Sequence, residues 1–218
     1  MTVWLIDTKT AAFVEAALVP IATEHVDQAR IAWGNEFQRR QRLFHYDEDF
    51  LVWTQGIMSP SSLIAGSVPK GYVIICCDQI QGFIVFDEAL QPSRRQPGTN
   101  LLYITYLATA PWNRRQGDET GLFRHVGRVL VAEAVRESVQ LGCPGRIGLH
   151  SYWTASPFYE KLRFDDLGPD ACRRGMSYFE LRTGVAYELL SEFGRCEDSQ
   201  SQLDSLCDYD AIQTRSSS

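Results

Sequence analysis

The stretch LLYITYLATAPWNR, residues 101–114, contains the strongest strand signal in the chain and decides its fold. Its first eight residues are mostly apolar, aromatic or β-branched, which favours a strand, and Pro111 ends the run. A polar loop follows, and the apolar spacing beyond it predicts a helix over 123–141, with Gly142 as a left-handed stop. A short strand is expected next, at 146–150. Because a helix that links two strands usually acts as a crossover, we expect these two strands to form a parallel pair.

Further elements are predicted on both sides of this unit. Two apolar runs at 71–77 and 81–86 predict an antiparallel hairpin. The other strands are expected at 12–19, 177–181 and 186–190, and the other helices at 23–42, 47–57 and 157–162. The sequence therefore predicts an α+β fold with a mixed, mostly antiparallel central sheet of about six to seven strands flanked by helices.

The chain has 218 residues, enough for one domain with a sizeable core. We expect this domain to span residues 1–194. The segment 195–218 is rich in Ser, Asp and Gln, with five acidic and two basic residues. Since it offers few apolar groups to bury, we expect it to form a disordered acidic tail.

Composition excludes several classes of protein. The net charge of −6 argues against a general nucleic-acid binder, which needs a basic surface. No apolar run approaches the ~18 residues of a membrane span, and the N-terminus lacks the pattern of a signal peptide. The six cysteines show no CxxC pair and no zinc-ligand spacing, so no metal site is expected. These observations indicate a cytoplasmic protein with a cationic or neutral substrate.

One candidate binding segment is the predicted helix start at 123–130, FRHVGRVL. Backbone N–H groups in a first helical turn lack partners within the helix and lie at the positive end of its dipole, which suits an anion such as a pyrophosphate. Gly127 would let a ligand approach the backbone closely, and Arg124 and Arg128 would add positive charge. On this segment alone, an ordinary strand–helix connection with solvated arginines is the stronger interpretation, because one glycine is a weak signal.

A second candidate segment follows the strand at 146–150. That strand ends in His150, and the short helix at 157–162 presents Tyr159, whose hydroxyl could protonate a leaving group. A half-buried core tyrosine explains Tyr159 about as well. For His150, a structural histidine at a strand end is the stronger alternative to a catalytic base.

Taken together, these segments resemble the GCN5-related N-acetyltransferase (GNAT) superfamily over about 101–181. That family's pattern runs I-x-x-L-A-V-x-P, then a glycine-rich Q/R-x-x-G-x-G/A helix start, and later A-x-x-F-Y-E-K-x-G-F. The positions that match the pattern are Ile104, Leu107, Ala108, Pro111, Gly127, Ala155, Phe158, Tyr159, Glu160, Lys161 and Phe164. The PWNR sequence at 111–114, with a longer polar loop after it, looks like a bacterial variant. Two departures stand out, because His125 and Arg163 occupy positions where the family usually has glycine.

The resemblance implies an acetyl-CoA-dependent N-acetyltransferase in which an amine attacks the thioester directly, without a covalent intermediate or a metal. The pantetheine would pair with the backbone of Leu107, Ala108 and Thr109, and the N–H of Leu107 would lie near the thioester oxygen. The pyrophosphate would be held by the backbone of Arg124, His125, Val126, Gly127 and Arg128. Tyr159 would protonate the departing thiolate.

The base that deprotonates the amine stays open. Family members often carry a glutamate on the strand at 104–107, where this sequence has no carboxylate. His150 is one candidate, since its ordinary pKa lies near neutrality. Other candidates are Glu36, Asp47, Glu48 and Asp87. The acceptor would be a small-molecule or protein amine, and a homodimer is left open. The alternative is a catalytically silent GNAT-like module that binds CoA or a protein partner.

Overall fold

The computed structural model of the chain describes residues 1–41, 70–87, 89–114, 121–173 and 175–193. The strands in these residues are β1 (Thr2–Asp7), β2 (Phe13–Pro20), β3 (Gly71–Cys76), β4 (Gln79–Phe86), β5 (Gln91–Pro92), β6 (Asn100–Thr109), β7 (Phe123–Arg124), β8 (Ile147–Ser151), β9 (Asp165–Asp170) and β10 (Met176–Leu181). The helices are α1 (Thr23–Gln41), α4 (Val126–Gln140), α5 (Ser156–Lys161) and α6 (Thr183–Phe193), with short 3-10 turns η1 (Pro111–Asn113) and η2 (Ala171–Arg173). The helix expected at 47–57 and the tail expected at 195–218 lie outside the described residues.

The described strands form one sheet of ten strands. Its order is β7-β1-β2-β3-β4-β6-β8-β10-β9, and β5 pairs with the start of β6. The pair of β6 and β8 is parallel, whereas its neighbours in the sheet pair antiparallel. The predicted α+β class and the predicted parallel pair, joined by α4, are therefore confirmed. The sheet is larger than expected, because β1, β5, β7 and β9 add to the predicted strands.

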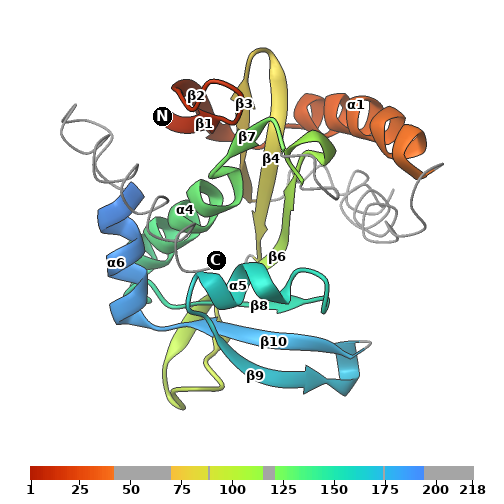
Figure 1. Ribbon diagram of the computed structural model, residues 1–218. Helices are drawn as coiled ribbons and strands as arrows, with labels where there is room; N and C mark the ends of the chain where they lie inside the picture. Colours follow the sequence, from red (N-terminus) through yellow and green to blue (C-terminus); the bar gives the residue numbers. More distant parts are fainter. Residues whose placement is uncertain (42–69, 88, 115–120, 174, 194–218) are drawn as a thin grey trace, which may run out of the picture.

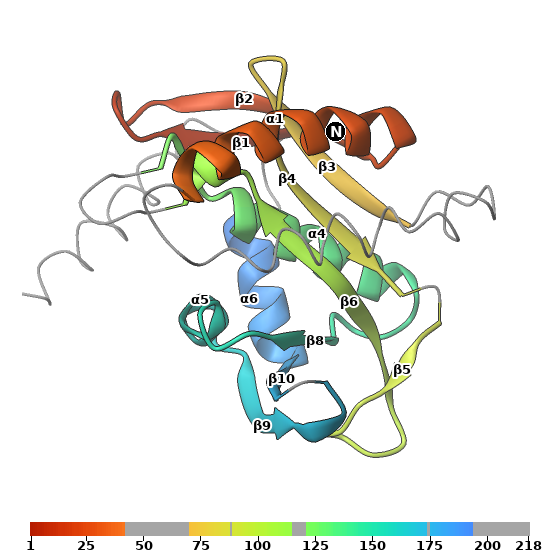
Figure 2. The same cartoon turned by 90° about the vertical axis from the view of Figure 1, so that its right-hand side faces the viewer.

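Helices cover both faces of the sheet (Figures 1 and 2). On one face, α4 and α6 enclose the larger hydrophobic cluster, which contains Leu130 and Phe179. On the other face, α1 buries Trp33 edge-on against Phe83, with ring centroids 5.4 Å apart, and the Trp33 indole N–H donates to the carbonyl of Ile80. In the described part of the chain, no helix combines the length and hydropathy that a membrane span requires.

The expected strand at 186–190 is wrong, since these residues lie within α6. Val185, Ala186 and Leu189 are all buried in the cluster under α4. Their spacing of three to four residues is the helical period, whereas a strand would bury every second residue. The apolar content of the segment is compatible with either element, and packing against α4 selects the helix.

Four strands were not expected from the sequence, namely β1, β5, β7 and β9. β1 forms a hairpin with β2, in which Trp4 lies opposite Glu15, although a single strand was expected in this region. β9 pairs with the outer side of β10 but contains Gly168 and Pro169, which are unfavourable in central strands. Such residues are tolerated at an edge, where one side of the strand needs no partner.

The helix expected from residue 123 begins at Val126 instead. Phe123 and Arg124 form β7 and pair with the end of β1. The turn between strand and helix is made by His125, whose φ of 74° lies in the left-handed region. This pairing with a distant strand explains why local periodicity placed the helix start too early.

The end of α5 provides a test of backbone strain. Arg163 has a φ of 62°, and its N–H donates to the carbonyl of Glu160 in a left-handed helix end. Such a conformation costs a side-chain-bearing residue about 1–2 kcal/mol relative to glycine. We expect Arg163→Gly to raise the melting temperature by about 2–4 °C in a calorimetric scan.

The matched control is Arg163→Ala. It removes the exposed ion pair with Glu188, as the glycine variant does, but keeps the left-handed strain. The alanine variant should therefore show no rise. Equal melting temperatures for the two variants would contradict the strain argument.

Candidate active site

The parallel pair of β6 and β8 opens partway along its length. The register runs from Leu102 opposite Ile147 to Ile104 opposite Leu149 and then stops. β6 continues to Thr109, paired only with β4 among the described strands. The two strands diverge beyond this point (Figures 1 and 2), so that the edge of β6 facing β8 has backbone groups available for a ligand.

A β-bulge lies where the strands part. Val85 pairs with Tyr106 and Phe86 with Ile104, so Thr105 is the extra residue. A bulge shifts the alternation of side chains and often redirects them next to a site. As a result, Ile104 and Leu107 both pack in the cluster under α4, three positions apart.

The hydrogen-bonding direction of β6 decides which backbone groups face the opening. The N–H of Ala110, the residue after β6, donates to the carbonyl of Gln81 in β4, at 2.8 Å. Because the direction alternates in an antiparallel pair, the N–H of Ala108 faces β4 as well, and those of Leu107 and Thr109 point the other way. Two of the three residues expected to pair with pantetheine thus offer backbone groups to the opening.

The first turn of α4 lies beside the C-terminal end of β6. A Cβ placed on Gly82, which pairs with Thr109, would lie 2.8 Å from Val126 and 2.9 Å from Leu130. Because glycine has no side chain, α4 packs closely against the sheet at Gly82. This contact brings the unpaired N–H groups of the helix start next to the opening.

Around the start of α4, the His125 side chain is neutral, whereas Arg124 and Arg128 are positively charged. Burial lowers the pKa of His125 to about 4, and the nearby cations Arg128 and Arg124 lower it further, so the imidazole is neutral at pH 7. Positive charge comes from the two arginines and from the helix dipole. The left-handed backbone of His125 also explains why the family pattern has glycine at this position.

Gly127 has a packing role that the sequence did not indicate. A Cβ there would lie 2.9 Å from the ring of Phe158, the residue before Tyr159 in α5. α5 therefore approaches the first turn of α4 closely. The two segments singled out from the sequence, which are about thirty residues apart, meet at this contact.

Tyr159 lies in an aromatic cluster next to this contact. It is 6% exposed, and its ring lies 5.1 Å from Phe158, 5.5 Å from Phe164 and 5.6 Å from Phe179 between centroids. Burial raises the pKa of its hydroxyl well above the ordinary value, so the group stays protonated at neutral pH. Burial is the sole cause of this shift, and no hydrogen bond joins the hydroxyl to a described residue.

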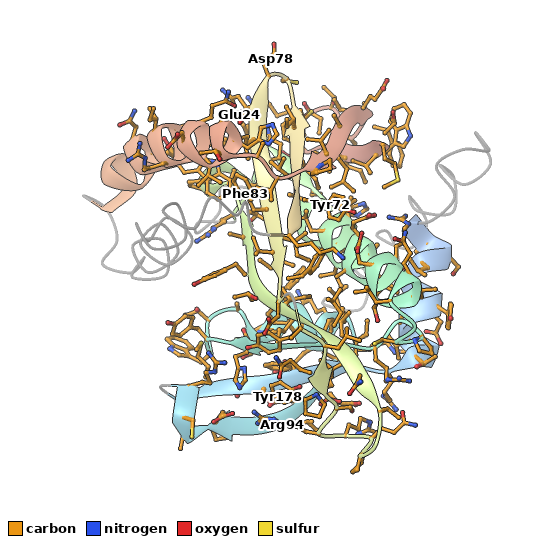
Figure 3. All side chains as sticks on the ribbon, turned by 180° about the vertical axis from the view of Figure 1, so that it is seen from behind. Glu24, Tyr72, Asp78, Phe83, Arg94 and Tyr178 are labelled. Carbon is orange, nitrogen blue, oxygen red and sulfur yellow. The ribbon has the colours of Figure 1, made fainter. Side chains whose placement is uncertain are left out.

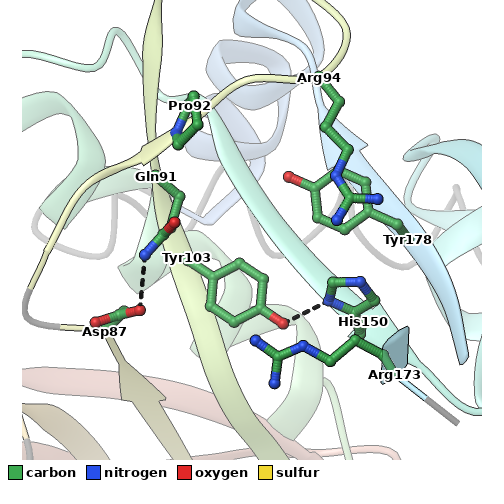
Figure 4. A pocket seen from close by; sticks show the side chains of 8 residues that line it. All are labelled: Asp87, Gln91, Pro92, Arg94, Tyr103, His150, Arg173 and Tyr178. Atoms are coloured by element: carbon green, nitrogen blue, oxygen red, sulfur yellow. Dashed lines mark hydrogen bonds between the residues drawn. The ribbon is translucent and has the colours of Figure 1, made fainter. Parts of the chain in front are cut away.

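His150 lies on the face of the sheet opposite α4, in a pocket of about 200 Å³. The pocket is lined by Asp87, Gln91, Pro92, Arg94, Tyr103, His150, Arg173 and Tyr178 (Figure 4). The His150 side chain is 5% exposed. Its Nδ1 lies 2.6 Å from the Tyr103 hydroxyl, and its Nε2 lies 3.0 Å from Asp170 Oδ2. Sequence reasoning found the histidine but not these partners.

Arg94 and Glu180 hold one wall of this pocket. Arg94 donates to Asp170 Oδ2 at 2.7 Å, and its guanidinium lies 4.0 Å from the centre of the Tyr178 ring (Figures 3 and 4). The loop that carries it is anchored by Glu180, which is 3% exposed and accepts from Ser93 Oγ and from the N–H of Arg94. Nothing in the sequence of this loop indicates the anchor.

The other residues considered as the catalytic base lie at different distances from this pocket or outside the described residues. Asp87 lines the pocket and accepts a hydrogen bond from Gln91 at 3.0 Å. Glu36 lies on α1 and is absent from the pocket lining. Asp47 and Glu48 lie outside the described residues.

Comparisons with known proteins place this geometry in context. No protein-family model and no curated protein matches the sequence significantly. Among solved structures, an acetyltransferase of the GNAT family from Desulfovibrio desulfuricans superposes with a TM-score of 0.51 at 15% identity, covering 77% of this chain and 99% of that one. The PaiA N-acetyltransferase from Thermoplasma acidophilum, in complex with coenzyme A, gives 0.52 at 13% identity, covering 77% and 98%. A mutant of the toxin AtaT, bound to the C-terminus of the antitoxin AtaR and to acetyl-CoA, gives 0.50 at 14% identity, covering 80% and 98%.

Proposed function

We propose that this chain, which has the fold of the GNAT-family acetyltransferases, transfers an acetyl group from acetyl-CoA to a primary amine. The observation that carries the proposal is the opening between β6 and β8. The start of α4 lies at one side of this opening and α5, which carries Tyr159, packs against that start. The proposed anion site, a strand edge available for pairing and a protonated hydroxyl would thus lie close together.

The residues present fit acetyl-CoA. The first-turn N–H groups of Val126, Gly127 and Arg128, with the guanidiniums of Arg124 and Arg128, would hold the pyrophosphate. The backbone groups of Leu107 and Thr109 that face away from β4 would pair with the pantetheine amides. In the dry interior beside the core, such backbone contacts orient the thioester without a side-chain contribution.

The chemistry follows from what each group can do in place. The neutral amine attacks the thioester carbonyl, and negative charge develops on its oxygen, where the N–H of Leu107 would stabilise it. The C–S bond then breaks, and the thiolate takes a proton from the Tyr159 hydroxyl, whose high pKa has kept it protonated. The new amide nitrogen releases its surplus proton, which restores the Tyr159 hydroxyl. Neutral His150, in the pocket on the other face, is the proposed base.

Binding and turnover test the proposal directly. Titration calorimetry with acetyl-CoA should show one site per chain. Thiol release should then follow the addition of acetyl-CoA together with spermidine, L-lysine or a lysine-containing peptide. Binding without thiol release from any amine would favour the silent module, and absence of binding would contradict both functions.

The pyrophosphate site yields a separate prediction. Arg128→Glu reverses a charge next to the first turn of α4, so we expect the dissociation constant of acetyl-CoA to rise roughly tenfold at low salt. The effect should shrink as salt screens it. Calorimetry at two salt concentrations measures both.

Arg30→Glu is the matched control. Arg30 lies on α1, where it pairs with exposed Asp27, and its reversal changes the net charge equally. An equal loss of affinity in both variants would show that overall charge, not a local site, controls binding.

A further inference from the structure

The pocket around His150 contains a continuous chain of hydrogen bonds. Asp170 is an ionised carboxylate that only accepts, because its ion pair with Arg94 holds its pKa far below the ordinary value. His150 must therefore carry its proton on Nε2 and donate it to Asp170. In a neutral imidazole, Nδ1 is then an acceptor, and the Tyr103 hydroxyl donates to it.

This series of hydrogen bonds is held in place at its Asp170 end. The Arg94 guanidinium lies between Asp170 and the Tyr178 ring, and Tyr178 packs on His150 with ring centroids 4.8 Å apart. The backbone N–H of Arg94 is fixed to Glu180 at 2.6 Å. Asp170 and His150 therefore have little freedom to turn away, and the Tyr103 hydroxyl is oriented by them.

The location of Tyr103 connects this series of hydrogen bonds to the opening between β6 and β8. Tyr103 directly precedes Ile104, the last residue of β6 that pairs with β8, and His150 directly follows its partner Leu149. Both side chains therefore lie at the point where the strands part. Because Ile104 and Leu149 pack under α4, Tyr103 and His150 lie on the opposite face of the sheet, where both point into the pocket (Figure 4). A molecule in the pocket therefore reaches this point from the side opposite the proposed pyrophosphate site.

We propose that this pocket receives the acceptor amine and that Tyr103 takes its proton by passing its own to His150. This inference rests on the proposed function and names the base and the contact residue for it. In the step, an N–H bond of the ammonium breaks and its proton goes to Tyr103 Oη. The former hydroxyl proton moves to His150 Nδ1, giving an imidazolium whose Nε2–H stays on Asp170. The amine lone pair is then free to attack, and the imidazolium later loses its proton to water.

The groups around the pocket keep Tyr103 and His150 in the protonation states from which the relay starts. Burial lowers the pKa of His150, and Arg94 and Arg173 lower it further, whereas Asp170 raises it. The net lowering leaves the imidazole neutral and able to accept at pH 7. Burial also raises the pKa of Tyr103, which keeps its hydroxyl protonated. The titratable and charged groups that face the relay from the surrounding elements are Asp87, Arg94, Asp170, Arg173 and Tyr178.

The pH dependence of Tyr103→Phe separates a proton relay from a structural role. With the relay intact, kcat/KM for the best amine of the panel should be flat above the lowered pKa of His150. Without the hydroxyl, the amine must arrive already neutral, so kcat/KM should rise tenfold per pH unit towards the amine's own pKa of about 10. The deficit of the variant should be at least roughly tenfold at pH 7 and should largely disappear near pH 10.

Tyr106→Phe is the matched control, since Tyr106 lies on the same strand but packs towards α1. Its profile should follow that of the unmodified protein. A deficit in Tyr103→Phe that is equal at every pH would overturn the relay and leave a structural role. An unchanged kcat/KM would overturn it as well.

A measurement without turnover distinguishes this inference from the proposed function. Nitrogen NMR of the four histidines, with His150 assigned through His150→Gln, should show a protonated Nε2 and a bare Nδ1 at neutral pH. A protonated Nδ1 would overturn the relay even in an active enzyme. The predicted tautomer without thiol release from any amine would instead contradict the proposed function alone.

Discussion

Replacing Tyr159 by phenylalanine is expected to lower kcat by roughly 10²-fold or more, the range typical of a lost general acid. The affinity for acetyl-CoA should change little, because the interaction is made mainly as the thiolate departs. The structure explains why the hydroxyl is suited to this role. It is buried among Phe158, Phe164 and Phe179, its pKa is raised, and no described residue competes for its proton.

The same environment makes the variant a clean one. Phenylalanine keeps the ring in the aromatic cluster, and no hydrogen bond to a described residue is lost, so the melting temperature should stay within about 2 °C. Thiol release measures kcat, and calorimetry measures affinity. Tyr187→Phe is the control, because Tyr187 is half exposed on α6. An unimpaired kcat in Tyr159→Phe would remove this residue from the mechanism, provided that chemistry limits the rate.

Gly82→Val is expected to give the second large effect, through packing and not through chemistry. The new Cβ would lie 2.8 Å from Val126, 2.9 Å from Leu130 and 3.0 Å from the carbonyl of Ala108. Since the Ala108 carbonyl is held within β6, the strain falls on the side chains of Val126 and Leu130, and we expect the first turn of α4 to move away from the sheet. Overpacking of this kind costs about 1–3 kcal/mol. It also displaces the N–H groups proposed to bind the pyrophosphate.

We therefore expect the Gly82→Val protein to remain folded below its lowered melting temperature but to lose acetyl-CoA affinity at least roughly tenfold. Gly184→Ala is the control, because a Cβ on this α6 residue meets nothing within 4 Å. It should keep its affinity and gain slightly in stability from a better helix propensity. If Gly82→Val binds acetyl-CoA normally, the start of α4 is not the anion site.

Local patterns in the sequence determined most of the elements near the site. The apolar run at 101–108, the helical stripe after it and the strand at 146–150 follow from side-chain periodicity, which depends on neighbouring residues alone. The parallel pairing of β6 with β8 follows from the helix between them, since a crossover of that length leaves few alternatives. His150 could be selected because it lies at the end of a predicted strand, and Tyr159 because it lies on a predicted short helix.

Other features depended on partners that are distant in the sequence. The true start of α4 depends on the pairing of β7 with β1, and the helical state of α6 depends on packing against α4. Gly127 is restricted by Phe158, and Gly82 by Val126. Sequence reasoning assigned Gly127 a role towards a ligand because the ring that covers it was not visible in the local pattern.

The sequence by itself thus determined the fold class, the crossover unit and the two segments that meet at the opening. Tertiary structure alone decided which residues His150 contacts, because its partners Tyr103 and Asp170 come from β6 and from the end of β9. The bulge at Thr105 and the point where β6 leaves β8 decide which side chains face the pocket. Periodicity reports which residues share a face within one element, whereas the register between elements is set by the whole sheet.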